Sequence, residues 1–568
     1  MQTEIKICQN CKNSFAIESE DFAFYDKIHV PPPTWCPECR MVRRMGWTGY
    51  RILYKRKCDF TGDDVITFYH PKVPYKIYRQ DVWWSDKWDP KTYGREYDFS
   101  RQFFEQFDEL LKSVPLPSLH NEYTTLINSE YCNGVGSLKN CYLCFQSGAG
   151  ATGNGHENTA YTHMVNDAKD CMDLSFSGQV ELCYEVVRAI HCYRALYSLN
   201  CEDCHDIYFC MDCVGCTSCI GCVNLRNKSY CIFNKQYTSE EFTKKLSELN
   251  LGSRSAAEEM KKKTQLFFVD KPRKAFHGRK NVNMSGDYIT HSKNARDSYL
   301  VQGGEDVRFS QILSPAAKCY DYTLFGVHAE WMYECAWDGL NTNMLKFCFW
   351  NYHAHHLDYC FGCHGSENLF GCVGIRKGSY CILNKQYTKE EYGTLVSKIK
   401  EQMSKVPYVD RKGRVYAYGE FFPPELSPWA FNESMASLGF VPFTKEQALA
   451  FGFTWRDDDP REYQASTAEI PDHINDVPDA FTKEMLKCIA CGKNYRIVPK
   501  ELDFYRRISI PVPQKCPLCR ERDRVKQLNP IKLYPRACAK CSMAMQTSYA
   551  PDCPEIVYCE SCYNSEVV

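Results

Sequence analysis

The chain has 568 residues, with 69 lysines and arginines against 70 aspartates and glutamates, which gives a formal net charge of −1. This balance excludes a chain-wide basic surface for nucleic acid and an acidic solvating tail. Hydrophobic residues make up 44% of the chain, which excludes wholesale disorder. No apolar run is long enough to span a bilayer, which excludes a transmembrane segment.

Cysteine is the exceptional residue, because 35 of them occur in a chain whose first residues lack the features of a signal peptide. We therefore expect a cytoplasmic protein. In a reducing compartment, an odd number and an excess of cysteines indicate metal ligands and buried thiols rather than disulfides.

The first predicted domain, residues 1–57, is a zinc ribbon. Cys8-Gln-Asn-Cys11 is followed after 24 residues by Cys36-Pro-Glu-Cys39. Each CxxC knuckle directs two thiolates at one ion, and two knuckles complete a closed tetrahedral zinc site. The binding energy of such a site stabilises a module whose core is too small to fold alone, so we expect a structural role.

Residues 58–127 are predicted to contain a metal-free ribbon followed by a helical segment. The C-terminal part of the chain repeats the N-terminal part at an offset of 480 residues, which places Cys58, Thr61, Arg79 and Val82 opposite four cysteines. Three of the four ligands are therefore missing, and we expect the ribbon backbone without its metal.

Residues 128–237 are predicted to form a first β-solenoid. Cysteines recur every nine residues in two interleaved series, which are Cys183, Cys192, Cys201, Cys210 and Cys219, and Cys204, Cys213, Cys222 and Cys231. A fixed short period is typical of stacked coils. Nine residues suit half of an 18-residue coil, and this is the coil length that we expect.

A second copy lies 150 residues further along the chain, where Ser229-Tyr-Cys-Ile-Phe-Asn-Lys-Gln-Tyr-Thr238 returns almost unchanged as Ser379 to Thr388. We expect a capping helix and linker at 238–283, a second solenoid at 284–387, and a capping helix with an aromatic and proline-rich connector at 388–480. Each capping helix opens with a capping box and should cover the open end of its solenoid.

The solenoid cysteines allow three interpretations, which are a metal cluster, a packed core and a redox switch. The series from Cys210 to Cys222, with a cysteine at every third residue, could hold a metal cluster, or it could pack a core as small hydrophobic side chains. Packing is favoured because, at the offset of 150, Ser366 replaces Cys216, Leu369 replaces Cys219 and Ala354 replaces Cys204.

A second candidate metal site is a cluster of histidines and cysteines in the second copy. Its members are His353, His355, His356, Cys360, Cys363 and His364. A mixed site of this kind could keep a coordination position open for catalysis. The alternative is a row of surface histidines above core cysteines.

Two further zinc ribbons are predicted at 481–530 and 531–568. Their ligands are Cys488, Cys491, Cys516 and Cys519 in the first, and Cys538, Cys541, Cys559 and Cys562 in the second. Together with the first ribbon, they lead us to expect about three structural zinc ions per chain.

Basic residues follow the last knuckle of two ribbons. Between Arg40 and Lys57 the chain has many lysines and arginines and no acidic residue, and Arg520, Arg522, Arg524 and Lys526 occupy the equivalent place in the ribbon at 481–530. The candidate nucleic-acid contacts are Arg40, Arg43, Arg44, Arg520, Arg522 and Arg524, because basic side chains beside aromatic ones suit phosphate contact and base stacking. The alternative is the solvated face of a small metal module.

The motifs of several common enzyme classes are missing. The chain has no P-loop, no dinucleotide-binding GxGxxG, no GxSxG and no HExxH. We therefore expect no enzymatic activity.

Two resemblances rest on these motifs. The pattern of both terminal ribbons resembles the probable zinc-ribbon, treble-clef-like domain of many uncharacterised bacterial proteins. The whole chain resembles a cysteine-rich repeat family of candidate-phyla-radiation (Patescibacteria) bacteria, often mislabelled "caib/baif family protein". Its landmarks here are Val30–Arg40, Trp83–Asp89, Asn384–Tyr387, Gly419–Pro423 and Tyr558–Tyr563. The resemblance implies no known activity.

The sequence thus predicts a mainly β fold, in which N- and C-terminal zinc ribbons flank a duplicated cysteine-rich β-solenoid with short capping helices. The favoured function is a non-enzymatic, multi-zinc scaffold that binds a protein or a ribonucleoprotein through the solenoid surface and the basic ribbon helices. One alternative is an RNA- or ribosome-binding protein that acts through Arg40–Lys57 and Arg520–Lys526. The other is a metalloenzyme or metal store that uses the solenoid cysteines and histidines.

Overall fold

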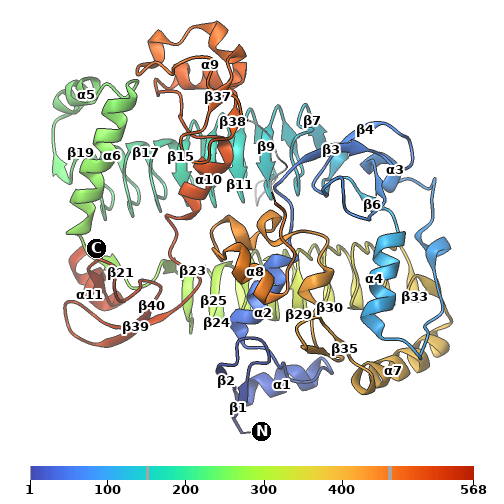
Figure 1. The fold of residues 1–568 in the computed structure, drawn as a ribbon. Helices are drawn as coiled ribbons and strands as arrows, with labels where there is room; N and C mark the ends of the chain where they lie inside the picture. The colour runs from blue at the N-terminus through green and yellow to red at the C-terminus, as the bar shows by residue number, and fades with distance from the viewer. Residues whose placement is uncertain (1, 149–152, 458–462, 568) are drawn as a thin grey trace. The chain divides into compact units, whose positions relative to one another are not determined.

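The computed structural model describes residues 2–148, 153–457 and 463–567 (Figure 1). They form two compact units, and neither unit is a continuous stretch of the chain. Unit 1 contains Met1–Leu119 and Phe276–Arg456, and unit 2 contains His120–Ala275 and Asp457–Val568. Each unit combines one large parallel sheet with two small cysteine-containing modules from one end of the chain.

The first sheet belongs to unit 2 and has 14 strands. They are β7 (Leu126–Ile127), β8 (Leu138–Lys139), β9 (Tyr142–Phe145), β10 (His156–Glu157), β11 (Ala160–His163), β12 (Asn166–Lys169), β13 (Met172–Ser175), β14 (Gly178–Glu181), β15 (Tyr184–Val187), β16 (Tyr193–Leu196), β17 (His205–Tyr208), β18 (Thr217–Ile220), β19 (Ser229–Ile232) and β20 (Lys235–Gln236). Tyr193 pairs with His205, His205 with Thr217, and Thr217 with Ser229. The parallel register therefore advances by 12 residues from β10 onward, the separation that also relates the hydrogen-bonded Cys204 and Cys216, whereas the steps from β8 to β10 and from β9 to β11 span 18 residues. The expected 18-residue coil is wrong.

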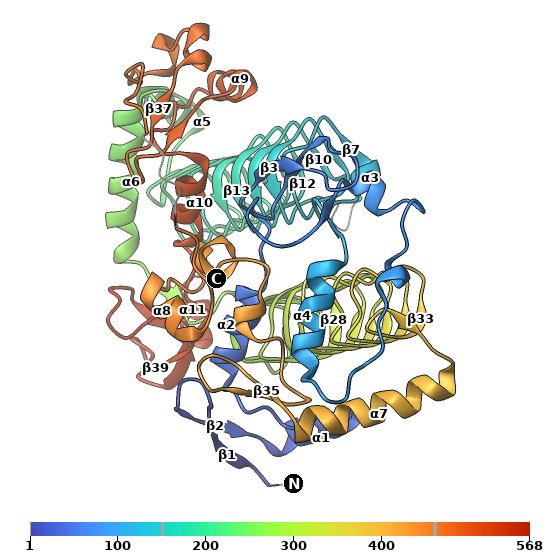
Figure 2. The same cartoon turned by 45° about the vertical axis from the view of Figure 1, so that its right-hand side comes forward.

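The second sheet belongs to unit 1, has 13 strands and is also mainly parallel. They are β22 (Gly278–Arg279), β23 (Gly286–Thr290), β24 (Lys293–Arg296), β25 (Ser298–Gln302), β26 (Gly304–Arg308), β27 (Gln311–Leu313), β28 (Ala316–Phe325), β29 (Ala329–Ala336), β30 (Asn343–Lys346), β31 (His355–Asp358), β32 (Glu367–Phe370), β33 (Ser379–Ile382) and β34 (Lys385–Gln386). Strands β30 to β34 repeat β16 to β20 at the offset that the sequence repeat predicts. Figure 2 shows both sheets as strongly curled layers.

The curl follows from an unusual backbone pattern. Every third residue from Asn158 to Phe233 has a positive φ, between 47° and 65°. The residue after each of these turns repeatedly belongs to the buried cluster inside the curl, from Val165 to Cys231. A side chain therefore points inward at every third residue, which leaves room mainly for small groups such as Cys, Ala, Ser and Val. The nine-residue spacing of the cysteines therefore corresponds to three of these three-residue steps.

The inward thiols also bind backbone groups. Cys213 Sγ lies 3.4 Å from the carbonyl oxygen of Met211 and 3.6 Å from that of Cys222. Cys204 Sγ accepts the backbone N–H of Cys216 at 3.4 Å. A buried backbone group without a partner is costly, so each thiol contributes by pairing such groups as well as by packing.

Serine can take the same place. Ser366, which stands where the first copy has Cys216, donates its hydroxyl to the carbonyl of His364 at 3.0 Å and accepts the N–H of Gly378 at 3.1 Å. The inward position thus selects a small side chain that both donates and accepts a hydrogen bond. The sequence pattern did not reveal this requirement.

Each sheet ends in a short antiparallel strand, and the predicted helix follows it. In unit 2, α5 (Ser239–Glu248) begins with the capping box of Thr238 and Glu241. In unit 1, α7 (Lys389–Lys405) begins with that of Thr388 and Glu391. The rings of Phe242 and Tyr392 contact Tyr230 and Tyr380 of the last parallel strand in their own sheets.

Four small modules form two matching pairs. Module 1 matches module 3, and module 2 matches module 4, both at the offset of 480 residues found in the sequence. Module 1 consists of β1 (Glu4–Ile7), β2 (Ser14–Ile17), α1 (Ser19–Lys27) and α2 (Pro37–Gly46), and module 3 of β37 (Leu486–Lys487), β38 (Asn494–Tyr495), α9 (Pro499–Arg507) and α10 (Pro517–Val525). Module 2 consists of β3 (Tyr54–Lys57), β4 (Asp64–Thr67), β5 (Ile77–Tyr78) and α3 (Gln80–Trp83), and module 4 of β39 (Tyr534–Ala537), β40 (Ala544–Thr547), β41 (Val557–Tyr558) and α11 (Glu560–Val567). Modules 1 and 2 belong to unit 1, and modules 3 and 4 to unit 2.

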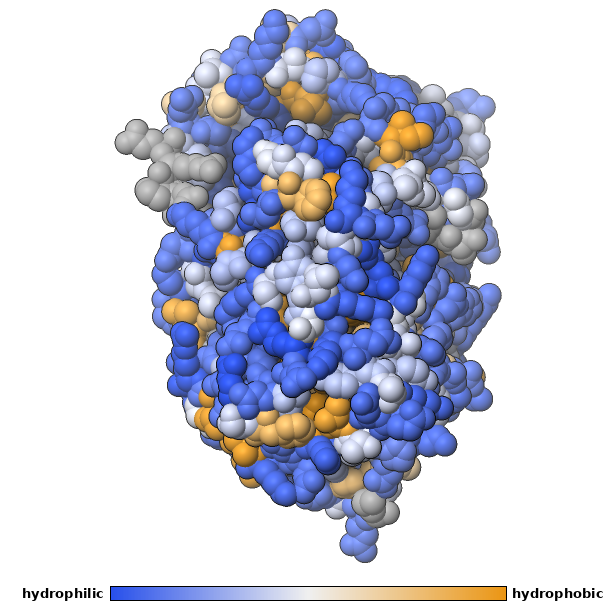
Figure 3. Space-filling view, turned by 90° about the vertical axis from the view of Figure 1, so that its right-hand side faces the viewer, coloured by the Kyte–Doolittle hydropathy of each residue, from blue (hydrophilic) through white to orange (hydrophobic). Residues whose placement is uncertain are grey.

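The remaining elements connect these parts. Unit 1 has η1 (Pro90–Tyr93), α4 (Phe103–Ser113), β6 (Leu116–Pro117), β35 (Tyr408–Val409), β36 (Val415–Tyr416), η3 (Pro424–Leu426), η4 (Phe431–Glu433), η5 (Ala436–Leu438) and α8 (Lys445–Phe451), and unit 2 has η2 (Tyr123–Thr125), α6 (Arg254–Val269), β21 (Arg273–Lys274), η6 (Ile474–Asp476) and η7 (Asp479–Lys483). No helix in the described residues has the length and apolar character needed to cross a membrane. On the face drawn in Figure 3, hydrophilic residues predominate and hydrophobic ones form small separate groups.

Candidate metal centres

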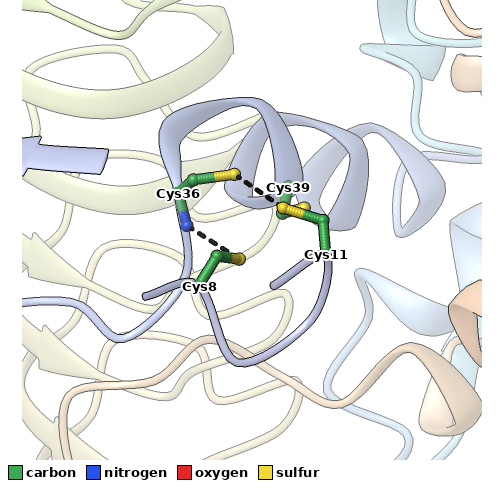
Figure 4. Close-up of side chains that lie close together, drawn as sticks. All are labelled: Cys8, Cys11, Cys36 and Cys39. Carbon is green, nitrogen blue, oxygen red and sulfur yellow. Dashed lines mark hydrogen bonds between the residues drawn. The ribbon is translucent and has the colours of Figure 1, made fainter. Parts of the chain in front are cut away.

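The first candidate metal centre lies where α2 meets the β1–β2 hairpin (Figure 4). Cys36 is the N-cap of α2, and its backbone N–H donates to Cys8 Sγ at 3.2 Å. The sulfur atoms of Cys11 and Cys36 are 3.7 Å apart. The ligand atoms of Cys8, Cys11, Cys36 and Cys39 all lie within 4.8 Å of one another, so this group could hold a metal ion.

Modules 3 and 4 build the same arrangement. In module 3 the N–H of Cys516 donates to Cys488 Sγ at 3.3 Å, and in module 4 the N–H of Cys559 donates to Cys538 Sγ at 3.2 Å. The complete groups are Cys488, Cys491, Cys516 and Cys519, and Cys538, Cys541, Cys559 and Cys562. The structure therefore brings together all twelve predicted ligands. Four thiolates fill a tetrahedral shell, which suits a structural ion rather than a catalytic one.

Module 2 keeps the backbone of such a centre without three of its four ligands, as predicted. Tyr54 pairs with Thr67 as Tyr534 pairs with Thr547. Cys58 Sγ accepts the N–H of Arg79 at 3.2 Å, the distance found between Cys538 and Cys559.

A charged side chain, Arg79, stands at one of the three positions in module 2 that have lost their ligand. Arg79 pairs with Asp63 at 2.7 Å and with Asp81 at 2.6 Å. Burial acts to raise the pKa of the Cys58 thiol, but hydrogen bonds from the Thr61 hydroxyl and from backbone amides outweigh it, and the pKa lies below its usual value. These contacts fix the loop that a metal ion would otherwise hold.

A chain carrying Thr61→Cys, Arg79→Cys and Val82→Cys is expected to bind one more metal ion than the unmodified chain, because the backbone of module 2 already matches that of module 4. Elemental analysis of purified protein measures the difference. The single variant Arg79→Cys is the control and should gain no ion. An unchanged metal content in the triple variant would contradict the equivalence of the two modules.

The arginines of α2 are buried in ion pairs, which corrects their predicted role. Arg40, Arg43 and Arg44 are each at most 1% exposed. Arg40 and Arg44 pair with Asp321 at 2.8 and 3.0 Å, and Arg43 pairs with Glu334 at 2.6 Å. Both carboxylates belong to the second sheet, far away in sequence, so these guanidinium groups are not available to phosphates.

The arginines of α10 are placed in the same way. Arg520 and Arg524 pair with Asp173 of the first sheet at 3.1 and 2.6 Å. Both are buried, so the prediction that they contact nucleic acid is also wrong. Arg522 is half-buried, and its role stays a prediction.

The same docking interface between module and sheet occurs inside each unit. Arg44 of α2 and Arg524 of α10 are equivalent residues of modules 1 and 3, and each donates to a carboxylate, a hydroxyl and a backbone carbonyl of its sheet. The acceptors, which correspond one to one in the two sheets, are Asp321 and Asp173, Thr323 and Ser175, and the carbonyls of Phe309 and Tyr161. Arg40 and Arg520 lie over the rings of Phe309 and Tyr161, at 5.3 and 4.8 Å. A buried pair of this kind is stable only when its geometry and hydrogen bonds are good, so the repeat indicates a specific interface.

The histidine and cysteine cluster of the second sheet does not converge. His353, His355 and His356 are exposed, whereas Cys360 and Cys363 are inward core residues. Among the described residues, no metal-competent group includes any member of the cluster. This arrangement matches the alternative of surface histidines above core thiols.

His364, the last member of the cluster, is buried among aromatic rings. The centroids of Trp350, Trp84 and Tyr352 lie 4.5, 5.0 and 5.2 Å from its own. Burial lowers the pKa of His364 to about 3, so the imidazole is neutral near pH 7.

The sequence analysis missed one further group of possible ligands. His191, Glu202 and Asp203 lie together on the surface of the first sheet, with His191 Nδ1 3.1 Å from Asp203 Oδ1. His191 and Asp203 are separated by one step of the parallel register and so lie side by side. The correct step length is the signal that would have found them.

A buried histidine of the first sheet makes the stability of unit 2 depend on pH. His156 Nε2 bonds to the carbonyl of Val165 at 2.8 Å and Nδ1 to the N–H of Ala168 at 3.2 Å, and burial lowers its pKa to about 4. The unfolded chain, with a histidine pKa of about 6.5, binds one more proton between about pH 4 and 6.5. The stability of unit 2 therefore falls as the pH drops through this range.

We expect His156→Gln to remove up to about 3 kcal/mol of this pH dependence, because glutamine can make similar bonds but does not titrate. Urea unfolding of both chains at pH 7 and pH 4.5 measures the difference between them. Equal pH dependence in the two chains would show that His156 is not responsible.

Comparison with known protein families, curated proteins and solved structures finds no match to this chain. The resemblance to the candidate-phyla-radiation family therefore stays a prediction from sequence motifs.

Proposed function

We propose that the protein is a non-enzymatic scaffold in which three structural zinc ions hold the modules, and in which the two curled sheets are β-solenoids that bind a macromolecular partner. Four cysteines form the ligand set that structural zinc prefers among common divalent metals. The regular parallel register of the first sheet supports stacked coils, as in other repeat proteins with an extended binding surface.

The observation that carries the proposal is the docking of the metal modules. In each unit, the helix that begins at a cysteine ligand pairs buried arginines with carboxylates of a sheet, which are Asp321 and Glu334 in unit 1 and Asp173 in unit 2. This arrangement supports a role for the metal ions in fixing the sheets, because the ligand helix and the docking helix are one element.

The exposed strand faces are the surfaces that we assign to the partner. They carry regular rows of opposite charges, such as Lys139 with Glu157 at 2.7 Å and Lys169 with Glu181 at 3.6 Å. Beside them, a row of three side-chain amides, Asn128, Asn140 and Asn158, ends at the carboxylate of Asp170, with each link at 3.1 Å. Balanced charges and amides favour a protein surface over a bare phosphate backbone, which requires excess positive charge.

Metal content tests the first half of the proposal. Elemental analysis of protein purified without oxygen and without added metal should give about three zinc ions and no iron. Cys216→Ser should keep that content and change the free energy of unfolding by less than about 1 kcal/mol, because Ser366 makes the same bonds in the second sheet. Iron, or an ion lost with Cys216, would place metal chemistry inside the sheets and reject the scaffold.

Site-specific photo-crosslinking tests the second half. A benzophenone residue at Tyr193, which is 38% exposed on the strand face, should capture a defined protein or ribonucleoprotein in cell extract. The same residue at Lys263 on the outer side of α6 is the matched control. Lys169→Glu should lower capture at Tyr193, because it breaks the charge row. Equal capture at both positions, or capture unaffected by Lys169→Glu, would reject this surface.

A further inference from the structure

Both sheets offer their module the same three acceptors, yet each module docks on only one sheet. Modules 1 and 2 precede the first sheet in the chain, but module 1 docks on the second. Since Arg44 could satisfy its bonds at Asp173 as well as at Asp321, the shared contacts give affinity without selectivity. Something outside these contacts has to distinguish the two sheets.

The distinguishing feature is the residue before this shared arginine. In α2 it is Arg43, which is fully buried, pairs with Glu334 at 2.6 Å and Glu420 at 2.9 Å, and lies 4.5 Å over the ring of Trp35. In α10 the equivalent residue has the opposite charge. It is Asp523, and it pairs with Lys515 at 2.7 Å.

Lys515 is itself the equivalent of Trp35, so both members of the contact have changed together. Trp35 stacks on a cation in module 1, whereas Lys515 pairs with an anion in module 3. Each module therefore carries a matched pair of residues. Trp35 suits the cation of Arg43, and Lys515 suits the anion of Asp523.

The sheets differ in the corresponding way. Tyr333 pairs with Tyr320 as Tyr184 pairs with Met172, which makes Glu185 the counterpart of Glu334. Glu185 already has a partner of opposite charge, because Lys261 Nζ of α6 lies 2.8 Å from Glu185 Oε1. Within the described part of the chain, Glu334 has no lysine of this kind and relies on the arginines of α2.

We infer that Arg43 and Glu334 form a pairing code that restricts the docking surface of the second sheet to module 1. A helix with an aspartate at this position would bring a second carboxylate to Glu334 and Glu420 in a buried site, and like charges in a desolvated interface are strongly unfavourable. The two arginines that modules 1 and 3 share supply affinity for a sheet. The residue at position 43 or 523 determines which of the two sheets the module docks on.

The full-length variant Arg43→Asp tests the code, because it gives module 1 the residue of module 3. The reporter is a benzophenone residue in place of Phe24, whose ring stacks on that of Tyr320 at 3.9 Å. We expect the fraction cross-linked to the segment 316–336 to fall by at least about tenfold, the change expected from about 1.4 kcal/mol of lost docking free energy.

The double variant Arg43→Asp with Glu334→Gln separates the code from simple damage. Removing the carboxylate of Glu334 removes one of the two negative charges that face position 43, so cross-linking should rise by at least about threefold over the single variant. A second reporter at Phe504, next to Tyr184 in unit 2, should be unaffected in all chains and shows that the protein is folded there. Cross-linking of the Arg43→Asp chain at the original level would overturn the inference, and so would a double variant that is no better than the single one.

Discussion

Replacing Cys36 with serine is expected to remove one metal ion and to destabilise unit 1 while unit 2 keeps its two ions. Cys36 is both a ligand and the N-cap of α2, so its loss releases the helix that carries Arg40, Arg43 and Arg44. Structural zinc contributes about 10 kcal/mol or more of apparent free energy to modules of this size. The buried carboxylates of Asp321 and Glu334 would also lose their partners, at a further cost of about 3–5 kcal/mol.

Thermal unfolding and elemental analysis of the same sample check this expectation. The matched control is Cys58→Ser in module 2, which removes a buried cysteine with similar backbone contacts that belongs to no metal-competent group among the described residues. The control should lose no metal and little stability. Loss of all three ions together, or a Cys36→Ser chain that melts like the unmodified one, would show that module 1 and unit 1 are not coupled as the structure indicates.

The sequence predicted the repeated parts well, because repetition is visible without knowledge of contacts. The offset of 480 identified the four modules, and the offset of 150 identified matching strands and capping helices, all of which the structure places at those offsets. All twelve ligands were found because CxxC spacing is a local property of one loop. Likewise, the loss of metal from module 2 could be read from Thr61, Arg79 and Val82 alone.

The coil length was wrong for an instructive reason. Side chains point inward at every third residue, and cysteine occupies only some of the inward positions, so the spacing of cysteines reflects which positions they fill and not the length of a turn. Nine and twelve are both multiples of three. The length of a turn is fixed by which strands pair through their backbones. That pairing depends on where each turn of the curled sheet closes, and it cannot be predicted from the positions of the cysteines.

The role of the arginines could not be predicted from the sequence around them. The run of arginines after Cys39 has no acidic neighbour in sequence, so phosphate contact or solvation were the reasonable expectations. Two partners of Arg44, Asp321 and Glu334, lie 277 and 290 residues away from it. Only the fold brings such charges together, and it does so in both units.

Asp321→Ala is expected to destabilise unit 1 severely. Asp321 is fully buried and accepts Arg40 at 2.8 Å and Arg44 at 3.0 Å, so its removal leaves two buried guanidinium groups that share the carboxylate of Glu334. Breaking a buried pair by removing one partner costs about 3–5 kcal/mol. Asp173→Ala should have the same effect on unit 2, because Arg520 and Arg524 then lose the carboxylate that they share.

The control for Asp321→Ala is Asp306→Ala. Asp306 has nearly the same positive φ, 53° against 52°, but it is exposed and bonds only to the amide of Asn294 at 2.7 Å among its side-chain partners within the described residues. Any cost of placing alanine in this backbone conformation is therefore common to both variants, and Asp306→Ala should cost about 1 kcal/mol or less. Urea unfolding, followed with one probe in each unit, measures the free energies. If the two substitutions cost the same, the ion pairs of Arg40 and Arg44 with Asp321 add nothing to stability beyond the backbone strain, and apolar contacts hold the module on the sheet. If only Asp321→Ala is severe, the metal module and the sheet fold as one cooperative body.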